Sequence, residues 1–126
     1  MSFLKWLIVE AYTPEEGRGW CWLSLFMGHV LLGAVTATII HTHFNINAYF
    51  IDFLCFFMYI MCKETVDYLR GGDFRDCLLD SIAFGFGVYA ITCLMLGLWQ
   101  SASLTFTAAF MVAIYGTYHV GYKPYD

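Results

Sequence analysis

The sequence predicts an all-α, polytopic membrane protein: a bundle of four transmembrane helices with a short N-terminal interfacial helix. Hydrophobic residues make up 60% of the 126 residues and charged residues 13%, and the mean hydropathy is +0.65. Soluble domains, in contrast, are about half apolar and a quarter charged. Many of the charged residues gather in one stretch, 63–80, between segments that are almost wholly apolar. The length indicates a single integral membrane domain covering 1–126.

The cysteines and the charge argue against two other classes of protein. Five cysteines are an odd number, and none of them forms a Cys-x-x-Cys pair, which indicates reduced thiols rather than a disulfide framework. The net charge of −4 comes with no basic patch, so we expect no nucleic-acid partner.

The first two elements differ in length. Residues 2–12 are apolar but too short to span a bilayer, which takes about 20 residues. We expect them to form a helix on the membrane surface, with Lys5 and Trp6 at the level of the headgroups. The first span follows at about 20–41, and it is uncharged unless His29 is protonated.

The second span runs over about 47–69, and its charged end extends past the membrane surface until Gly71-Gly72 breaks the helix. The third span is expected at about 76–98 and the fourth at about 101–119. The connection between them is short, so these helices should be antiparallel. One long helix over 76–119 is the alternative, but it would greatly exceed the thickness of a bilayer.

The basic residues test this topology. With four spans, all six lysines and arginines fall on one side of the membrane: Lys5, Arg18, Lys63, Arg70, Arg75 and Lys123. The positive-inside rule then places both termini in the cytoplasm and the chain in the cytoplasmic (inner) membrane. Aromatic residues should lie at the two interfaces: Trp20, Trp22, Tyr118 and Tyr122 on the cytoplasmic side, and Tyr49 and Trp99 on the other.

Each span carries a narrow stripe of small or polar residues at helical spacing. In the order of the spans, the stripes are His29, Gly33, Thr36 and Ile40; Asp52, Phe56, Tyr59, Lys63, Asp67 and Arg70; Asp73, Asp76, Asp80, Ala83, Gly87 and Ala90; and Thr105, Ala109, Val112, Gly116 and His119. Such stripes are typical of helices that pack closely in lipid. They predict a compact bundle whose ionisable groups gather at the cytoplasmic end.

Four carboxylates of this end form a candidate metal site: Glu64, Asp67, Asp76 and Asp80. Carboxylates from two antiparallel helices could bind a hard divalent cation, which takes oxygen ligands. Such a cation could hold a lipid phosphate, with Lys63, Arg70 or Arg75 assisting.

A structural interpretation competes with this one. Lys63 and Asp67 have the spacing of a helical ion pair, as do Asp67 and Arg70. Asp73 is a good N-cap for the third span, and Asp76 lies in its first turn. Asp80 alone lacks such an explanation, and a carboxylate among apolar residues is a functional candidate.

Histidines add two further hypotheses. His29 faces the predicted bundle and could meet Asp80 or Glu64, and such a pair could transfer protons; His119 could join it from the fourth span. The three residues His29, Glu64 and Asp80 are therefore the catalytic candidates, although no reaction is indicated.

The outer loop contains the second histidine pair, His41 and His43, and Asp52 follows it. Two histidines and a carboxylate could bind zinc or copper, but solvated turn residues are the favoured interpretation.

The residues of the polar stretch resemble a known pattern. Glu64-x-x-Asp67, Gly71-Gly72 with Arg75, and Asp80-x3-Phe84-x2-Gly87, preceded by His29, resemble the signature of VanZ-like membrane proteins. This family has Gln where Asp67 stands and Asn where Phe84 stands. The resemblance implies a small bacterial or phage envelope protein with a link to glycopeptide tolerance.

The leading functional hypothesis is a bacterial or phage inner-membrane protein whose cytoplasmic-side acidic cluster binds a lipid headgroup, a cation or a protein partner. The candidates for contact with a lipid or a partner are Lys63, Asp67, Arg70, Arg75 and His119. Two alternatives are a holin-like, pore-forming homo-oligomer and an accessory subunit of a larger membrane complex.

Overall fold

The structure is a computed structural model that describes Phe3, Leu7 and residues 19–121, with side chains at 22–119 within the latter range. The predicted interfacial helix 2–12 lies almost wholly outside the described residues. The basic residues Lys5, Arg18 and Lys123 also lie outside the described residues.

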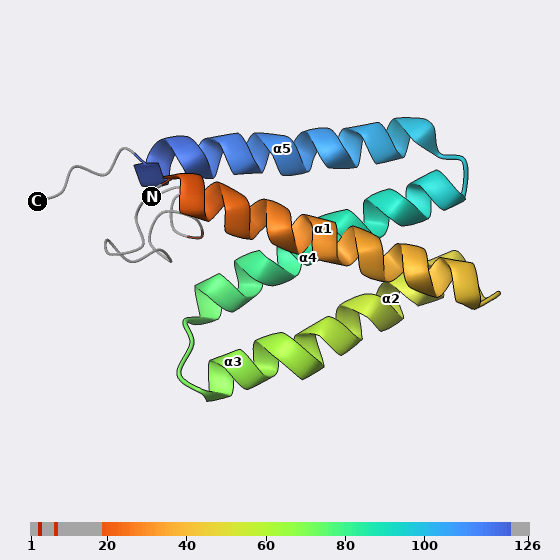
Figure 1. Ribbon diagram of the computed structural model, residues 1–126, viewed down its shortest axis with the longest axis horizontal. Coiled ribbons are helices and arrows are strands. Elements are labelled where there is room, and N and C mark those ends of the chain that lie inside the picture. Colours follow the sequence, from red (N-terminus) through yellow and green to blue (C-terminus); the bar gives the residue numbers. More distant parts are fainter. Residues whose placement is uncertain (1–2, 4–6, 8–18, 122–126) are drawn as a thin grey trace, which may run out of the picture.

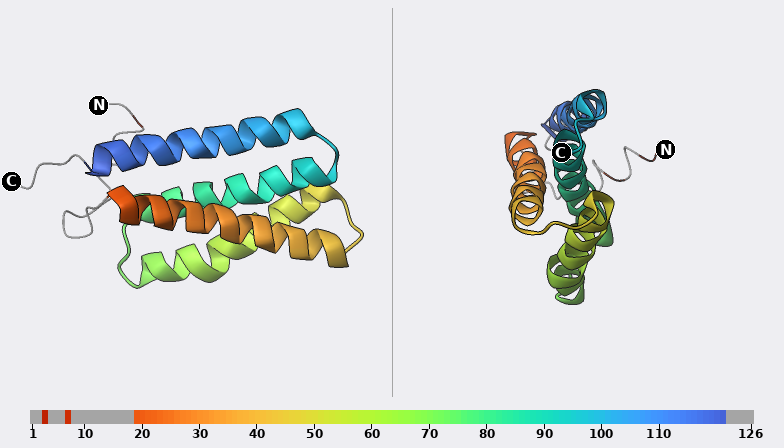
Figure 2. Two further views of the ribbon diagram at one scale, coloured as in Figure 1. Left: turned by 45° about the horizontal axis from the view of Figure 1, so that its top comes forward. Right: turned by 90° about the vertical axis from the view of Figure 1, so that its right-hand side faces the viewer.

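The described chain is all-helical and folds as long rods that alternate in direction (Figure 1). In chain order the elements are α1 (Gly19–His43), α2 (Ala48–Tyr59), η3 (Ile60–Glu64), α3 (Thr65–Leu69), α4 (Phe74–Met95) and α5 (Trp99–Gly121). The segments α2, η3 and α3 follow one another without a break and form a single rod. Helix α4 is central, because it contacts α1, α5 and the α2–α3 rod (Figure 2).

Local residues explain where the rods begin and end. The side chain of Asn47 accepts hydrogen bonds from the backbone N–H groups of Tyr49 and Phe50 at the start of α2. Asp73 caps α4 as predicted by accepting from the backbone of Arg75. The Arg75 guanidinium also bonds to Asp73 and holds the pKa of that carboxyl below its usual value. The break after α3 is at Gly71, whose φ of 97° favours glycine.

Helices α1 and α4 cross at two glycines of the predicted stripes. A Cβ atom built on Gly87 would lie 1.9 Å from the carbonyl oxygen of Val30, and one on Gly33 would lie 2.1 Å from that of Phe84. These distances are far below van der Waals contact, so only glycine allows the two backbones to approach this closely. Ala83 and Ala90, on the same stripe of α4, are fully buried.

The α1–α5 contact corrects one prediction. Trp22 was expected at the membrane interface, but it is only 2% exposed. Its ring stacks on Phe26 and fills the space over Gly116, where a Cβ would lie 2.3 Å from the indole. The absence of a side chain at Gly116 is what makes room for the indole. Tyr118, Tyr49 and Trp99 are exposed, as expected of interfacial residues.

Two boundaries also differ from the expected ones. Helix α1 continues to His43, so the pair His41 and His43 lies in its last turn and not in a loop. Helix α4 ends at Met95 and α5 begins at Trp99, so the connection 96–98 lies earlier in the chain than the predicted spans placed it.

Two of the helices are long and apolar enough to cross a membrane. They are Trp22–His43, with a mean hydropathy of 1.9, and Phe74–Met95, with a mean hydropathy of 1.8. The all-helical prediction is therefore confirmed, and two of the helices have the composition of membrane spans.

Candidate functional site

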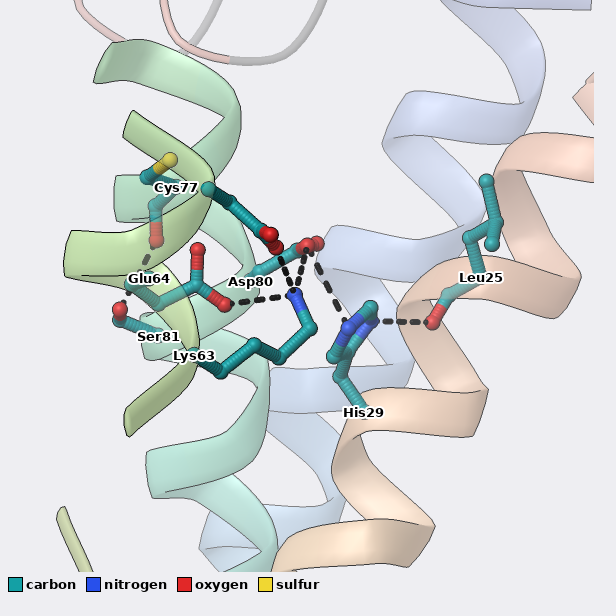
Figure 3. Close-up of polar contacts among 8 residues, drawn as sticks. Leu25, His29, Lys63, Glu64, Cys77, Asp80 and Ser81 are labelled. Carbon is teal, nitrogen blue, oxygen red and sulfur yellow. Dashed lines mark hydrogen bonds and ion pairs between the residues drawn. The ribbon is translucent and has the colours of Figure 1, made fainter. Parts of the chain in front are cut away.

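Helix α1 begins, α5 ends and α3 turns into α4 at the same end of the bundle (Figure 1). Five ionisable side chains come together toward this end. We call the five residues that meet there the polar cluster. Four of them are labelled in Figure 3, namely His29 from α1, Lys63 and Glu64 from η3 and Asp80 from α4, and the fifth is Asp67 from α3. All of them except Glu64 line a cavity of about 430 Å³, which is also lined by Asp76 and by apolar side chains of α1 and α4.

Lys63 lies at the centre of the polar cluster. Its Nζ atom is 2.9 Å from Glu64 Oε1, 3.2 Å from Asp67 Oδ2 and 3.4 Å from Asp80 Oδ2. The predicted pair of Lys63 with Asp67 is therefore present, but it is one of three. One ammonium group thus faces three carboxylates.

The backbone of η3 brings two adjacent side chains into this site. The N–H of Thr65 bonds to the carbonyl of Ile60, five residues back, so the turn is π-helical. A π turn holds one more residue than an α turn, and successive side chains therefore point in more similar directions. As a result, Lys63 reaches the cavity while Glu64, only 4% exposed, still faces the bundle. Single π turns in α-helices are frequent at functional sites.

His29 has a defined tautomer. Its Nδ1 atom lies 2.8 Å from the carbonyl oxygen of Leu25, and because a carbonyl can only accept, Nδ1 must carry the hydrogen. The other ring nitrogen, Nε2, lies 3.3 Å from Asp80 Oδ2. In a neutral His29, a lone pair on Nε2 would face a carboxylate oxygen, which also only accepts. The Lys63 ammonium, 3.4 Å from the same Asp80 oxygen, supplies positive charge beside this contact.

Tyr59 is a further member of this region that lies on the predicted stripe of the second span. Its side chain stacks on Phe84 with 4.0 Å between ring centroids, and it is only 8% exposed. Its buried hydroxyl makes no well-formed hydrogen bond with the described residues, although the Glu64 carboxylate lies near enough to interact with it. An unsatisfied buried hydroxyl is costly, by about 1–3 kcal/mol.

The other predicted site residues are distributed differently. Asp76 lines the cavity, whereas Arg75 pairs with Asp73 at 2.9 Å and Arg70 is exposed at the α3–α4 turn. His119 packs against the rings of Tyr115 and Tyr118 on α5 and is not among the residues that line the cavity.

A second polar group lies at the opposite end of the bundle. Thr92, fully buried on α4, donates to Asp52 of α2 and lies 2.7 Å from His41 Nε2 of α1. His43 bonds instead to the carbonyl of Ile39 within its own helix. The two histidines and Asp52 therefore do not converge as a zinc or copper site would require. The group connects three helices through hydrogen bonds.

Within the described residues, the side chains with the spacing of metal ligands are His29, Glu64 and Asp80. One ligand atom from each lies within 4.8 Å of the others. This set shares Glu64 and Asp80 with the predicted acidic set, and it replaces Asp67 and Asp76 with His29.

No family model, no curated protein and no solved structure matches the chain. The resemblance to VanZ-like proteins therefore stays a prediction.

Proposed function

We propose that the chain is a small multi-pass protein of the bacterial or phage-infected cytoplasmic membrane, and that its polar cluster binds a positively charged group at the cytoplasmic surface. Its role in the envelope would follow the VanZ-like resemblance and rests on that resemblance alone.

Apolar side chains on the outside of the rods support the membrane location. Long apolar residues are exposed on α1, on the α2–α3 rod and on α5, and examples are Leu31, Phe53 and Met111 at 64%, 62% and 61%. Apolar surface of this extent is stable when lipid or another protein covers it. All four rods are long enough to cross a bilayer, since 22 or more residues at about 1.5 Å each span about 33 Å.

Charge placement supports the orientation. Lys63, Arg70 and Arg75 belong to η3, to the turn after α3 and to the start of α4. This turn lies at the same end of the bundle as the start of α1 and the end of α5 (Figure 1). The positive-inside rule assigns this end to the cytoplasm.

The observation that carries the binding proposal is the excess of acceptors in the polar cluster. Among the described residues, Glu64, Asp67 and Asp80 share a single ammonium group, and His29 Nε2 adds a further acceptor. Charges in a partly buried site are stable when they are compensated. A site with this deficit of positive charge favours a cationic group, such as a primary ammonium or a metal ion.

The small-residue stripes support a site within one copy of the chain. Gly33 and Gly87 pack against backbone of the same chain, and Gly116 packs against the Trp22 side chain. These faces are therefore occupied inside the monomer, which favours the binding proposal over a pore formed between copies.

Ligand-dependent stability in lipid nanodiscs tests this proposal. The probes are phosphatidylethanolamine, soluble ethanolamine and Zn²⁺, so that a lipid-held and a free ammonium group are compared with a metal ion. A ligand present at 100 times its Kd stabilises a protein by about 2.7 kcal/mol. We expect at least one probe to raise the unfolding temperature of the wild type, and Asp80→Asn to remove that effect.

Asp73→Asn is the matched control, because Asp73 lies at the same end but pairs with Arg75, and asparagine still caps a helix. It should respond to the probes as the wild type does. If no probe stabilises the wild type more than Asp80→Asn, the binding proposal is wrong.

A further inference from the structure

We infer that His29, Glu64 and Asp80 bind one divalent transition-metal ion, which displaces the ammonium group of Lys63 from the polar cluster. This inference rests on the proposed cation site and names the cation.

The three ligands come from three different rods, and their separation fits one ion. Zinc binds nitrogen and oxygen ligands at about 2.0–2.1 Å, so two ligand atoms on a tetrahedral ion lie about 3.3 Å apart. His29 Nε2 and Asp80 Oδ2 are 3.3 Å apart. Glu64 offers a carboxylate oxygen in the same group, whose ligand atoms all lie within 4.8 Å. To bind the same ion, the Glu64 carboxylate has to move closer to the other two ligand atoms.

His29 is prepared for this role by its bond to the backbone. Because Nδ1 donates to the carbonyl of Leu25, the lone pair of the neutral ring is on Nε2, the atom that faces Asp80. Metal-binding histidines usually donate their second N–H to a carbonyl or carboxylate in this way, which fixes the tautomer and orients the ring.

Tyr59 gives an independent indication of a ligand. Its hydroxyl is buried, lies near the Glu64 carboxylate and makes no well-formed hydrogen bond with the described residues. Its ring contacts those of His29 and Phe84, at 6.3 Å and 4.0 Å between centroids. The Lys63 ammonium is 5.6 Å from the centre of the same ring. A metal site with three protein ligands keeps a position for water, and such a water is a partner of the kind that this hydroxyl needs.

Lys63 can leave the cluster without losing all of its partners. Its side chain is 39% exposed, and Asp67, one helical turn later, is 46% exposed. When an ion binds between Glu64 and Asp80, the ammonium can move outward and keep its pair with Asp67. Lys63 is thus a tethered competitor for the ion.

The ligand set indicates the class of ion. One imidazole and two carboxylates suit Zn²⁺, Co²⁺ or a related transition metal, whereas Mg²⁺ and Ca²⁺ prefer oxygen ligands alone. A wholly acidic site of Glu64, Asp67, Asp76 and Asp80 would favour the latter ions.

The test measures Zn²⁺ affinity by calorimetry and Co²⁺ coordination by visible absorption, on the full chain in nanodiscs. Cys62→Ser is the background, because Cys62 is exposed and thiols bind both ions. We expect Lys63→Met to raise the affinity by about tenfold or more, since it removes the competing charge. His29→Gln and Asp80→Asn should each lower the metal affinity by about 100-fold or more. Loss of a residue that only hydrogen-bonds to a metal ligand already lowers the affinity by about 10- to 100-fold.

Asp67→Asn and Asp76→Asn are the matched controls, and they should change the affinity by less than His29→Gln does. Lys63→Gln replaces Lys63→Met if the latter does not fold. The metal inference is wrong if neither Lys63 variant binds Zn²⁺ or Co²⁺, or if His29→Gln binds as the parent does. Stabilisation by ethanolamine that depends on Asp80, with no metal binding, overturns the metal inference and leaves the proposed function standing.

Discussion

Gly87→Ala is expected to lower the free energy of unfolding by about 3 kcal/mol or more, although it adds a single methyl group. The new Cβ would lie 1.9 Å from the carbonyl oxygen of Val30 and 2.7 Å from the backbone nitrogen of Ala34. Both contacts are with backbone, so no side-chain rotation relieves them. Helices α1 and α4 would have to separate, and the polar cluster, which spans both, would open with them.

Gly28→Ala is the matched control for this substitution. Gly28 lies on α1, and a Cβ there meets nothing within 4 Å. Alanine favours a helix over glycine by about 1 kcal/mol, so this variant should be as stable as the wild type or more stable. Reversible unfolding of the detergent-solubilised protein, followed by circular dichroism, gives both values. Equal stability of the two variants would contradict the close crossing of α1 and α4.

Lys63→Met is expected to have the second large effect, a loss of about 2–3 kcal/mol in the absence of divalent ions. Removing one partner of a buried ion pair costs about 3–5 kcal/mol. Lys63 and Asp67 are partly exposed, so solvent screening reduces this figure. Most of the loss comes from Glu64, which is only 4% exposed and would be left without its counter-ion.

A second substitution isolates this cause. Lys63→Met combined with Glu64→Gln should recover at least half of the lost stability, because the buried charge is then gone. Arg70→Met makes the same change in charge at an exposed position and should cost no more than about 0.5 kcal/mol. Thermal unfolding in nanodiscs compares the three variants. A Lys63→Met protein as stable as Arg70→Met would show that the cluster carries no stabilising charge interaction.

Much of the site follows from helical spacing. Helical spacing predicted that His29 could meet Asp80 or Glu64 and that Lys63 could pair with Asp67. The structure has the pairs His29–Asp80 and Lys63–Asp67. Asp73 was identified as an N-cap by its place before an apolar helix, and it is one. These features depend on local sequence and on which face of a helix is small or polar.

Other features depend on packing between rods and could not be predicted in this way. The π turn at Ile60–Glu64 has no sequence signature, and without it Glu64 would be assigned to a different face from Lys63. Thr92 was one of several threonines in apolar segments, and its bonds to Asp52 and His41 require three helices to meet. Trp22 was placed at the interface because tryptophan favours it, but Gly116 on another rod provides the space that buries it.

The central claim is that the rods cross a membrane and that the polar cluster lies at its cytoplasmic face. Single cysteines introduced as Arg70→Cys and Leu98→Cys in a cysteine-free background test it most directly, because they mark the two ends of α4. Both positions are exposed. A membrane-impermeant maleimide should label residue 70 only from the cytoplasmic side and residue 98 only from the opposite side. Labelling of both from the same side, or recovery of the chain in solution without detergent, would contradict the claim.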